Sequence, residues 1–384
     1  MKILFVLTYY RPHVSGLTIY VERLARALAR RGHQVTILTS QYTKSLAREE
    51  MVDGICVVRV PVLFRLNKGV VMPSFAAVAV REIRAHDVVS IHLPQVEGAL
   101  ATWLARRAGR RPILTYHCDL QMPPVWYGRI VDRLTYWDNL AAGRLADVIV
   151  AYTEDFATHS PFLSRFLAEG KVQVILPPVV IPEPRPAEVA ALRERIGLDG
   201  QRVIGFAARF AYEKGAGYLI NAIPHILEEI PNVRLVFAGP YKDVIGETIW
   251  DDLQPLIKQY EPYLTFLGTL NPAQMADFFA ACDVVTVASI NNTESFGLVQ
   301  VEAFMCGTPV VATDLPGVRQ PVRMTGMGEI VPVADTAGLA EGIIKVLKDR
   351  DAYIRPRAEI TRRFAFERTT DAYEALFASR AVRE

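Results

Sequence analysis

Short runs of β-branched and aromatic residues recur along the chain and are separated by longer amphipathic stretches. In the first half these runs are apolar without alternation, which is typical of strands that are buried on both faces of a parallel sheet. They are residues 3–8, 35–39, 55–60, 88–93, 112–116, 148–151 and 172–176. The pattern predicts an α/β fold in which helices cross between the strands.

Residues 18–31 are an example of the segments that connect the predicted strands. Ile19, Leu24 and Leu28 fall on one helical stripe, arginines occupy the opposite side, and Gly32 follows as a stop signal. This spacing predicts an amphipathic helix that packs on the sheet.

A proline-rich segment divides the chain. Residues 176–186 read LPPVVIPEPRP, and so many prolines exclude a central strand or a helix interior. The strand pattern then restarts at residues 203–207, 233–238, 264–267, 284–288, 309–312 and 329–333. We therefore expect two doubly wound Rossmann-like domains, 1–180 and 181–365, whose ligand cleft lies at carboxyl ends of strands. Residues 366–384 form a C-terminal helix with the option of packing back on the first domain.

Composition narrows the class of protein. The chain has 384 residues, 51% of them hydrophobic, 22% charged and 9% aromatic, which excludes fibrous and unfolded classes. No run approaches a membrane span, and residues 2–7 lack the features of a signal peptide, so we expect a cytoplasmic protein. The cysteines, Cys56, Cys118, Cys282 and Cys306, lie far apart in apolar settings and read as reduced core residues.

The formal net charge of +2 conceals a division between the halves. Residues 1–180 contain 22 Lys and Arg against 14 Asp and Glu, whereas residues 181–384 contain 21 against 27. A basic first half and an acidic second half suggest domains with different partners. The moderate charge and the lack of an aromatic-basic module argue against nucleic-acid binding.

A strand end in the second half carries two cations. Arg209 and Lys214 lie in the loop after residues 203–207, where an Arg can clamp two phosphate oxygens and a Lys adds a compact charge. Taken alone, the pair also fits solvated loop charges.

A second loop in the same half supplies carboxylates and backbone amides. Glu294 caps a predicted helix, and Glu302 follows two turns later, inside the apolar run 301–305, where an unpaired carboxylate is unfavourable. The amides of Phe296, Gly297 and Leu298 stand at the positive end of that helix, which suits an anion.

These motifs resemble the GT-B glycosyltransferases of the large retaining family 4, and the resemblance covers essentially the whole chain. Its most specific part is the E-x7-E pattern of Glu294 and Glu302 ahead of residues 303–312. The resemblance implies that Arg209 and Lys214 hold the donor diphosphate and that Glu302 takes the ribose hydroxyls. Glu294 and the 296–298 amides would address the donor sugar and its phosphate.

The resemblance also assigns further donor contacts. Leu267 and Gly268 fall in the loop whose backbone meets the nucleobase. Gly16 falls in the glycine-rich loop before the first helix, where most members have two adjacent glycines and this chain has Ser15-Gly16. Ser15 is equally well explained as a helix cap. His117 matches the histidine that such enzymes aim at the donor sugar, although a lone His is more often structural.

The acceptor side is expected on the first domain, with His13, Ser15, Asn67 and Asp119 as its weaker predictions. Arginines 106, 107, 110 and 111 around Trp103 suit anionic lipid headgroups or a lipid diphosphate carrier, and they suit a solvated helix end about equally well. Peripheral contact with the inner face of a membrane follows from the first of these interpretations.

The reaction needs no metal in this interpretation, because fixed cations and helix-end amides can stabilise the charge on a departing nucleoside diphosphate. The one literal D-x-D, residues 349–351, joins two terminal helices and reads as surface charge. We predict no cofactor, catalytic roles for His117, Glu294, Arg209 and Lys214, and front-face attack by the acceptor.

The predicted activity is transfer of a hexosyl unit from a nucleoside-diphosphate sugar, UDP favoured over GDP, to a glycan, lipid or lipid-linked acceptor. A sugar-nucleotide 2-epimerase of the same architecture and a non-catalytic donor-binding protein remain alternatives. A dehydrogenase is weaker, since no G-x-G-x-x-G follows a strand. The residues leave the sugar, the acceptor and the oligomeric state open.

Overall fold

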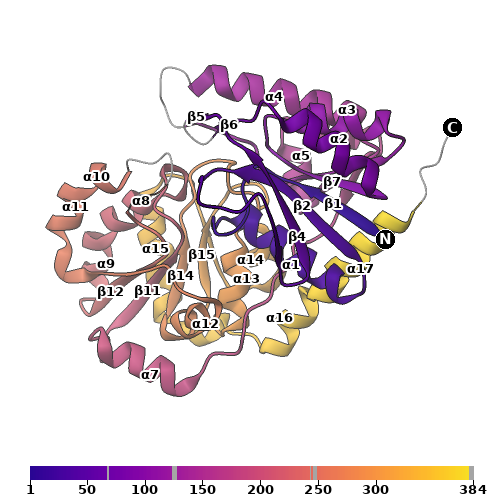
Figure 1. Cartoon of the computed structure of the whole chain (residues 1–384). Coiled ribbons are helices and arrows are strands. Elements are labelled where there is room, and N and C mark those ends of the chain that lie inside the picture. Colours follow the sequence, from indigo (N-terminus) through magenta and orange to yellow (C-terminus); the bar gives the residue numbers. More distant parts are fainter. Residues whose placement is uncertain (67–68, 123–127, 243, 245–248, 380–384) are drawn as a thin grey trace. The chain divides into compact units, whose positions relative to one another are not determined.

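Each half of the chain builds a parallel sheet of its own in the computed structural model (Figure 1). The structure describes residues 1–66, 69–122, 128–242, 244 and 249–379. They divide into an N-terminal unit, Met1–Pro178 with Phe366–Glu384, and a C-terminal unit, Val179–Ala365.

The sheet of the N-terminal unit has the strand order β10-β9-β8-β7-β1-β2-β4-β3. Its strands are β1 (Lys2–Val6), β2 (Gln34–Gln41), β3 (Glu49–Val52), β4 (Ile55–Pro61), β7 (Val88–Leu93), β8 (Arg111–Tyr116), β9 (Val148–Ala151) and β10 (Val172–Val174). All neighbours pair in parallel except β3, which is antiparallel to β4. The predicted doubly wound parallel sheet is confirmed.

The helices of this unit include the predicted amphipathic one, which spans Gly16–Arg30 where residues 18–31 were expected. They are α1 (Gly16–Arg30), α2 (Phe75–Ala85), α3 (Gly98–Arg107), α4 (Gly128–Leu145), α5 (Glu154–His159), α6 (Ser164–Leu167) and α17 (Phe366–Ala378). Ser15 caps α1, because its side-chain oxygen accepts a hydrogen bond from the Thr18 amide at 3.2 Å. Gly32 follows α1 with a positive φ of 86°, as a stop signal should.

The C-terminal unit repeats the architecture with the strand order β13-β12-β11-β14-β15-β16, all parallel. Its strands are β11 (Arg202–Ala207), β12 (Val233–Ala238), β13 (Leu264–Gly268), β14 (Val284–Val287), β15 (Val310–Thr313) and β16 (Gly328–Val331). Its helices are α7 (Pro186–Arg195), α8 (Ala216–Asn221), α9 (Ile223–Glu229), α10 (Ile249–Asp252), α11 (Gln254–Gln259), α12 (Pro272–Ala281), α13 (Leu298–Met305), α14 (Gln320–Thr325), α15 (Thr336–Lys348) and α16 (Arg357–Arg363).

The last helix returns to the first sheet. The Tyr373 hydroxyl on α17 lies 2.6 Å from the Tyr20 hydroxyl and 2.9 Å from Thr115 Oγ1, and all three side chains are buried. Arg111 donates to the backbone oxygen of Leu376 at 2.8 Å. Helix α17 is thus part of the core of the N-terminal unit, although the whole C-terminal unit lies between it and the rest of that unit in sequence.

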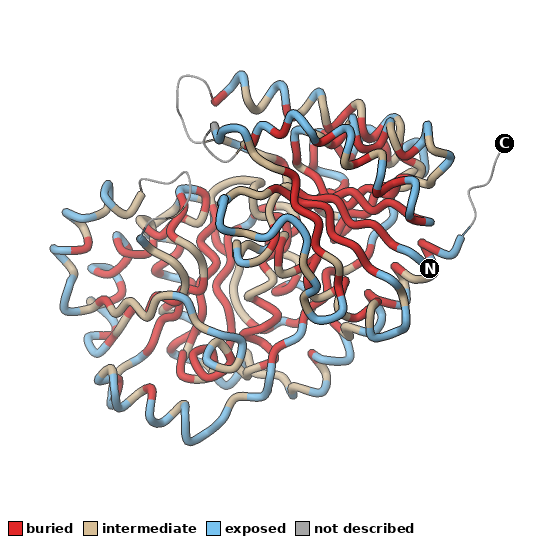
Figure 2. The backbone as a smooth tube through the Cα atoms, viewed as in Figure 1, coloured by how far each residue is buried: buried red, intermediate tan, exposed pale blue. Residues whose placement is uncertain are grey.

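Burial follows the strands of both sheets (Figure 2). The four cysteines are unpaired, as predicted, and burial raises the pKa of Cys306 to about 12, so this thiol stays protonated. Three strands were not predicted: β3, and the antiparallel pair β5 (Phe64–Leu66) and β6 (Gly69–Val71). The turn Asp53-Gly54, with positive φ at both residues, was the available signal for the β3–β4 hairpin.

Candidate functional site

Two loops at the carboxyl ends of β11 and β14 bring the predicted donor residues of the C-terminal unit together. These strands are neighbours in the sheet, and the Ile290 amide after β14 donates to the Glu213 carbonyl after β11 at 3.0 Å. Gly215 ends the first loop with φ +70°, and a Cβ there would lie 2.0 Å from the Ala288 carbonyl oxygen. The two loops are therefore packed backbone against backbone, and only glycine fits at the contact.

Arg209 and Lys214 are each paired with a carboxylate of these loops. Arg209 forms an ion pair with Glu213, whose side chain is almost fully buried, and Lys214 forms one with Glu294. The side chains of Lys214 and Glu294 are each 20% exposed. Lys214 and Glu294 therefore both keep contact with water, and in the other pair Arg209 does so with a side chain that is 24% exposed.

Glu294 also contacts the start of α13. Its Oε1 accepts a hydrogen bond from the Gly297 amide at 2.9 Å, while its Oε2 accepts one from Lys214. The prediction of free amides along residues 296–298 is therefore wrong for Gly297, because a carboxylate three residues earlier already takes its N–H. Gly297 itself adopts a positive φ of 74° ahead of Leu298, the first residue of the helix.

Glu302 is buried in α13, as its apolar neighbours predict. It is 8% exposed and lies one turn beyond Leu298. Gln300, fully buried beside it, donates to the Phe296 carbonyl at 2.9 Å and to the Val318 carbonyl at 2.8 Å. This amide ties the start of α13 to the loop after β15 and fixes the helix end from which Glu302 projects.

The predicted nucleobase loop closes β13. Gly268 has a φ of +71°, and its carbonyl oxygen accepts a hydrogen bond from the Gly239 amide at 2.8 Å. Leu267 is half-buried. The Gly268 carbonyl thus accepts one hydrogen bond within the protein, which joins the end of β13 to the residue after β12.

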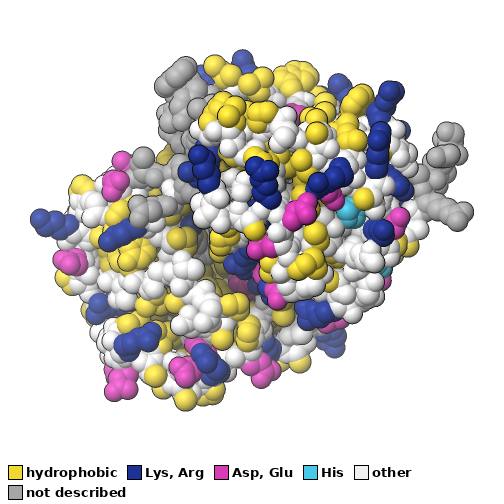
Figure 3. Space-filling view, in the orientation of Figure 1, with side chains coloured by type: hydrophobic (Ala, Val, Ile, Leu, Met, Phe, Trp, Pro, Cys, Tyr) yellow, Lys and Arg dark blue, Asp and Glu magenta, His cyan; other side chains and the backbone are white. Residues whose placement is uncertain are grey.

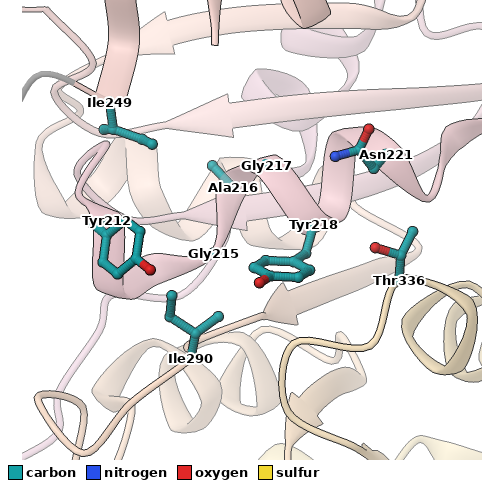
Figure 4. A pocket seen from close by; sticks show the side chains of 9 residues that line it. All are labelled: Tyr212, Gly215, Ala216, Gly217, Tyr218, Asn221, Ile249, Ile290 and Thr336. Carbon is teal, nitrogen blue, oxygen red and sulfur yellow. The ribbon is translucent and has the colours of Figure 1, made fainter. Parts of the chain in front are cut away.

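A small pocket opens beside the cationic loop (Figure 4). Figure 4 shows the rings of Tyr212 and Tyr218 on either side of Gly215, with Ile290 beneath them. The pocket is lined by Tyr212, Gly215, Ala216, Gly217, Tyr218, Asn221, Ile249, Ile290 and Thr336. None of these is a predicted donor residue, so this hollow does not coincide with the Arg209–Lys214–Glu294 cluster.

In the N-terminal unit, the loop before α1 carries three predicted residues. The Ser15 hydroxyl is engaged in capping α1, which supports the simpler of its two interpretations. A Cβ added at Gly16 would meet nothing within 4 Å, so packing within the protein does not require glycine there. The His13 ring packs against Tyr9 at 4.9 Å and Tyr42 at 6.1 Å between centroids.

His117 follows β8 and is held by hydrogen bonds at both ring nitrogens. Its Nε2 lies 2.8 Å from His92 Nδ1, and its Nδ1 is hydrogen-bonded to the Tyr152 hydroxyl. The ring also stands edge-on to Tyr20, with centroids 5.0 Å apart. His92 and Tyr152 therefore hold the His117 ring in one orientation.

Both histidines are neutral at physiological pH. Burial lowers the pKa of His92 to about 3, and burial together with the neighbouring His92 lowers the pKa of His117 well below its ordinary value. With one proton on each ring, one of the two must donate to the other. His117 is thus a neutral hydrogen-bonding group rather than a cation.

Two further acceptor-side predictions have different outcomes. Asp119 is buried and accepts hydrogen bonds from the Tyr116 hydroxyl at 2.9 Å and from Ser160 at 2.7 Å. Burial raises the pKa of this carboxyl. Asp119 thus links β8 to the segment after α5, which is a structural task. Asn67 lies outside the described residues.

The arginines around Trp103 are more engaged than the sequence suggests. Arg106 donates to the Leu145 carbonyl at 2.8 Å, Arg110 to the Arg84 carbonyl at 2.9 Å, and Arg111 to backbone oxygens of α17. Three of the four therefore fasten neighbouring elements, and the basic patch as predicted is largely structural. Arg107 differs, because its guanidinium stacks on Trp103 at 5.6 Å.

Within the described part of the chain, no three His, Cys, Asp or Glu side chains gather as a metal site. In the D-x-D triplet, Arg350 donates to the carbonyls of Asp283 and Gly307 at 3.1 Å each. The triplet thus lies in a packing turn between α15 and α16. No helix among the described residues has the length and apolarity to cross a bilayer.

Sequence reasoning missed the side chains that support the predicted ones. Glu213 was passed over as part of a charged loop, yet it is 4% exposed and pairs with Arg209. His92 was passed over within an apolar strand, although a polar residue inside such a run is itself a signal of a buried hydrogen bond. Tyr152, which follows β9, gave no signal.

Each of the two units matches a known protein family. Residues 189–363 match the family described as Glycosyl transferases group 1, and residues 14–181 match Glycosyltransferase Family 4. Between them the two matches span most of both Rossmann-like units.

Relatives align along nearly the whole chain. The D-inositol 3-phosphate glycosyltransferase of Xylanimonas cellulosilytica is 30% identical over 405 residues, covering 96% of this chain and 93% of that protein. The phosphatidyl-myo-inositol mannosyltransferase of Mycobacterium leprae is 26% identical over 381 residues, covering 95% and 93%.

Solved structures share the fold. Anabaena HepE in complex with UDP superposes with a TM-score of 0.75 at 22% identity, covering 99% of this chain and 100% of that one. WaaG, a glycosyltransferase involved in lipopolysaccharide biosynthesis, gives a TM-score of 0.72 at 17% identity, covering 98% and 100%. At these identities the likeness is one of architecture.

Proposed function

Because the chain belongs to the retaining family 4 glycosyltransferases of the GT-B type, we propose that it transfers a hexosyl unit from a nucleoside-diphosphate sugar to a glycan, lipid or lipid-linked acceptor. The observation that carries the proposal is the joined pair of loops after β11 and β14, with Arg209 and Lys214 paired to Glu213 and Glu294. Two relatives named for inositol-containing acceptors make an inositol-bearing acceptor the first to try.

The paired cations suit a ligand whose charge changes during reaction. As the anomeric bond lengthens, the leaving diphosphate gains negative charge, and Arg209 and Lys214 can move from their carboxylates to phosphate oxygens. A cation already held within a rigid loop loses little rotamer freedom on binding, so its energy goes into charge stabilisation. Glu294, released from Lys214, is then available to a sugar hydroxyl.

Glu302 and His117 complete the proposed assignment. Glu302 lies one turn into α13, whose start is fixed by the Gln300 contacts, and would accept hydrogen bonds from the ribose hydroxyls. His117 would lie beside the donor sugar as a neutral ring held by His92 and Tyr152, which adds no positive charge beside a developing oxocarbenium ion. The chemistry uses no metal in this proposal.

The experiment is a turnover assay with UDP- and GDP-hexoses and inositol, inositol phosphate and lipid extracts as acceptors. We expect acceptor-dependent release of the nucleoside diphosphate, with UDP-sugars preferred, in the presence of a chelator. NMR of the product should show the donor's anomeric configuration retained. Conversion of the donor into an epimer without acceptor, or an inverted product, would contradict the proposal. A strict divalent-metal requirement would contradict its metal-free chemistry.

A further inference from the structure

The outward side of α4 carries large apolar residues where a surface helix ordinarily carries polar ones. Ile130, Leu134 and Trp137 are 57%, 66% and 59% exposed, and their spacing of four and then three places them on one stripe. The opposite side of α4 is buried, with Thr135, Asn139 and Leu140 facing inward. Helix α4 therefore carries an apolar stripe on its exposed side.

The neighbouring helix α3 continues this surface. Leu100 and Trp103 are exposed on α3, and Val96 is exposed just before it. The Ala99 amide donates to Asp138 at 3.2 Å near the start of α3, and Arg106 reaches Leu145 at its end. The two helices therefore run side by side in the same direction, and their outward stripes belong to one surface.

We call this surface the α3–α4 face. It consists of Val96, Leu100, Trp103, Ile130, Leu134 and Trp137. Figure 3 shows hydrophobic side chains gathered over α4 and α3, with Lys and Arg side chains among and beside them.

Charges around the face are positive toward solvent. Arg129 and Arg133 are exposed on α4, and Arg107 is exposed on α3 with its guanidinium over Trp103. The nearby acids are turned inward: Asp132 accepts from the Met122 amide at 3.0 Å, and Asp138 accepts from Ala99. The face thus offers apolar side chains and arginines to a partner, with its carboxylates directed to backbone amides.

A third acid adds little negative charge. Glu97 lies half-buried before α3, and burial raises its pKa to about 7. Burial likewise raises the pKa of Asp138 to about 6. Near neutral pH, Glu97 is therefore protonated for a large part of the time, and the arginines determine the sign of the local charge.

We propose that the α3–α4 face docks the N-terminal unit on the surface of an anionic lipid bilayer. Trp103 and Trp137 suit the headgroup boundary, Ile130 and Leu134 the outermost acyl chains, and the arginines the lipid phosphates. An apolar stripe bordered by arginines, with its carboxylates turned inward, complements such a surface in both polarity and charge. The inference rests on the exposure of these residues and is independent of the transfer reaction.

The test is sedimentation of the purified full chain with vesicles of phosphatidylcholine, with and without about 30% phosphatidylglycerol. We expect binding to the anionic vesicles, little binding to the neutral ones, and weaker binding as salt rises. A blue shift of tryptophan emission should accompany binding and diminish in Trp103→Phe and Trp137→Phe.

Matched variants distinguish vesicle binding by the α3–α4 face from nonspecific hydrophobic binding. The triple variant Ile130→Ser, Leu134→Ser, Trp137→Ser should lower the vesicle partition coefficient by about tenfold or more, because three exposed apolar groups are removed. Met51→Ser with Val174→Ser, exposed apolar residues elsewhere in the same unit, should leave it unchanged. Arg129→Gln with Arg133→Gln should remove the preference for anionic lipid, whereas Arg195→Gln on α7 should not.

A preserved melting temperature and a preserved nucleotide-induced shift in that temperature would show that the variants fold. Equal binding by the wild type and the triple variant, or no binding to anionic vesicles at low salt, would overturn the proposal. A dimer in light scattering that the triple variant converts to a monomer, without wild-type vesicle binding, would instead assign the face to self-association and also overturn it.

Discussion

The two regions that carry the predicted site residues hold them in opposite electrical states. In the C-terminal unit, Lys214 is charged, paired with Glu294 and partly exposed. In the N-terminal unit, His117 is neutral, buried and hydrogen-bonded at both ring nitrogens. A partly exposed ion pair can exchange one partner for a phosphate more easily than a buried neutral network can rearrange. The first arrangement suits binding a charge, and the second suits holding one group in a fixed orientation.

The largest effect should come from removing a charge from the ion pair of the C-terminal unit. Lys214→Ala removes the cation that we assign to the leaving diphosphate, and kcat/KM for the donor should fall by about 100-fold, equivalent to ~3 kcal/mol of transition-state stabilisation. Steady-state release of nucleoside diphosphate measures it. Lys348→Ala, which removes an exposed pair with Glu229, is the control and should leave the rate unchanged. A Lys214→Ala enzyme within about threefold of wild type would refute the assignment.

The buried neutral histidines of the N-terminal unit should make the free energy of unfolding depend on pH. In the unfolded chain, His92 takes up a proton near pH 6.5, but in the folded protein only near pH 3. Protons therefore favour unfolding throughout this window, and stability is lost as pH falls below about 6.5. At pH 5 the loss from His92 should be roughly 2 kcal/mol relative to pH 7.5. His117 contributes with the same sign.

Urea unfolding of wild type, His92→Asn and His92→Phe at both pH values tests this. Each variant should be less sensitive to acid than wild type, because one buried histidine is gone. His92→Asn keeps an amide group near the position of Nδ1, so it should retain more activity than His92→Phe, and this difference identifies His92 as a positioning residue. An unchanged pH dependence in both variants would show that His92 is not the buried neutral group described here.

A smaller effect is expected at Gly16, where a substitution should lower activity without lowering stability. Since a Cβ at this position meets nothing within 4 Å, Gly16→Ala should fold normally and melt at or slightly above the wild-type temperature. If the donor approaches this backbone closely, kcat/KM should nevertheless fall by about tenfold. Gly98→Ala is the contrasting variant, because its Cβ would lie 2.5 Å from Leu93 Cδ2 and should lower stability instead. Full activity in Gly16→Ala would remove Gly16 from the site.

The smallest effect concerns α17. Tyr373→Phe leaves the hydroxyls of Tyr20 and Thr115 without their shared partner in the core of the N-terminal unit. We expect a loss of about 1–2 kcal/mol in the free energy of unfolding and little change in donor affinity. Chemical denaturation and nucleotide titration of the same variant measure both. Loss of nucleotide binding without loss of stability would contradict a purely structural role for this hydroxyl.

The fold was predictable because its strands are continuous apolar runs. In β1 and β11, for example, nearly every residue is buried, so the hydrophobic pattern alone marks them. Strand β3 escaped because it is a short edge element that begins with two glutamates and owes its place to pairing with β4. Edge strands are defined by their partner more than by their own sequence.

The candidate site was predictable only in part, for a related reason. Glu302 could be predicted because a carboxylate within an apolar helix is unfavourable unless it has polar partners, and the side chain is indeed buried. The pairing of Lys214 with Glu294 joins residues 80 positions apart, which spacing along the chain cannot reveal. Sequence likewise gave no means of telling that Glu294 already occupies the Gly297 amide.

The central claim is that the charged loops of the C-terminal unit bind a nucleoside diphosphate, and calorimetric titration of UDP and GDP tests it most directly. The wild type should bind at least one of the two, and Lys214→Ala and Glu302→Ala should each weaken binding by roughly tenfold or more. Glu228→Ala, an exposed carboxylate on α9, should bind as the wild type does. Unchanged affinity in both site variants, or no binding of either nucleotide by the wild type, would contradict the account.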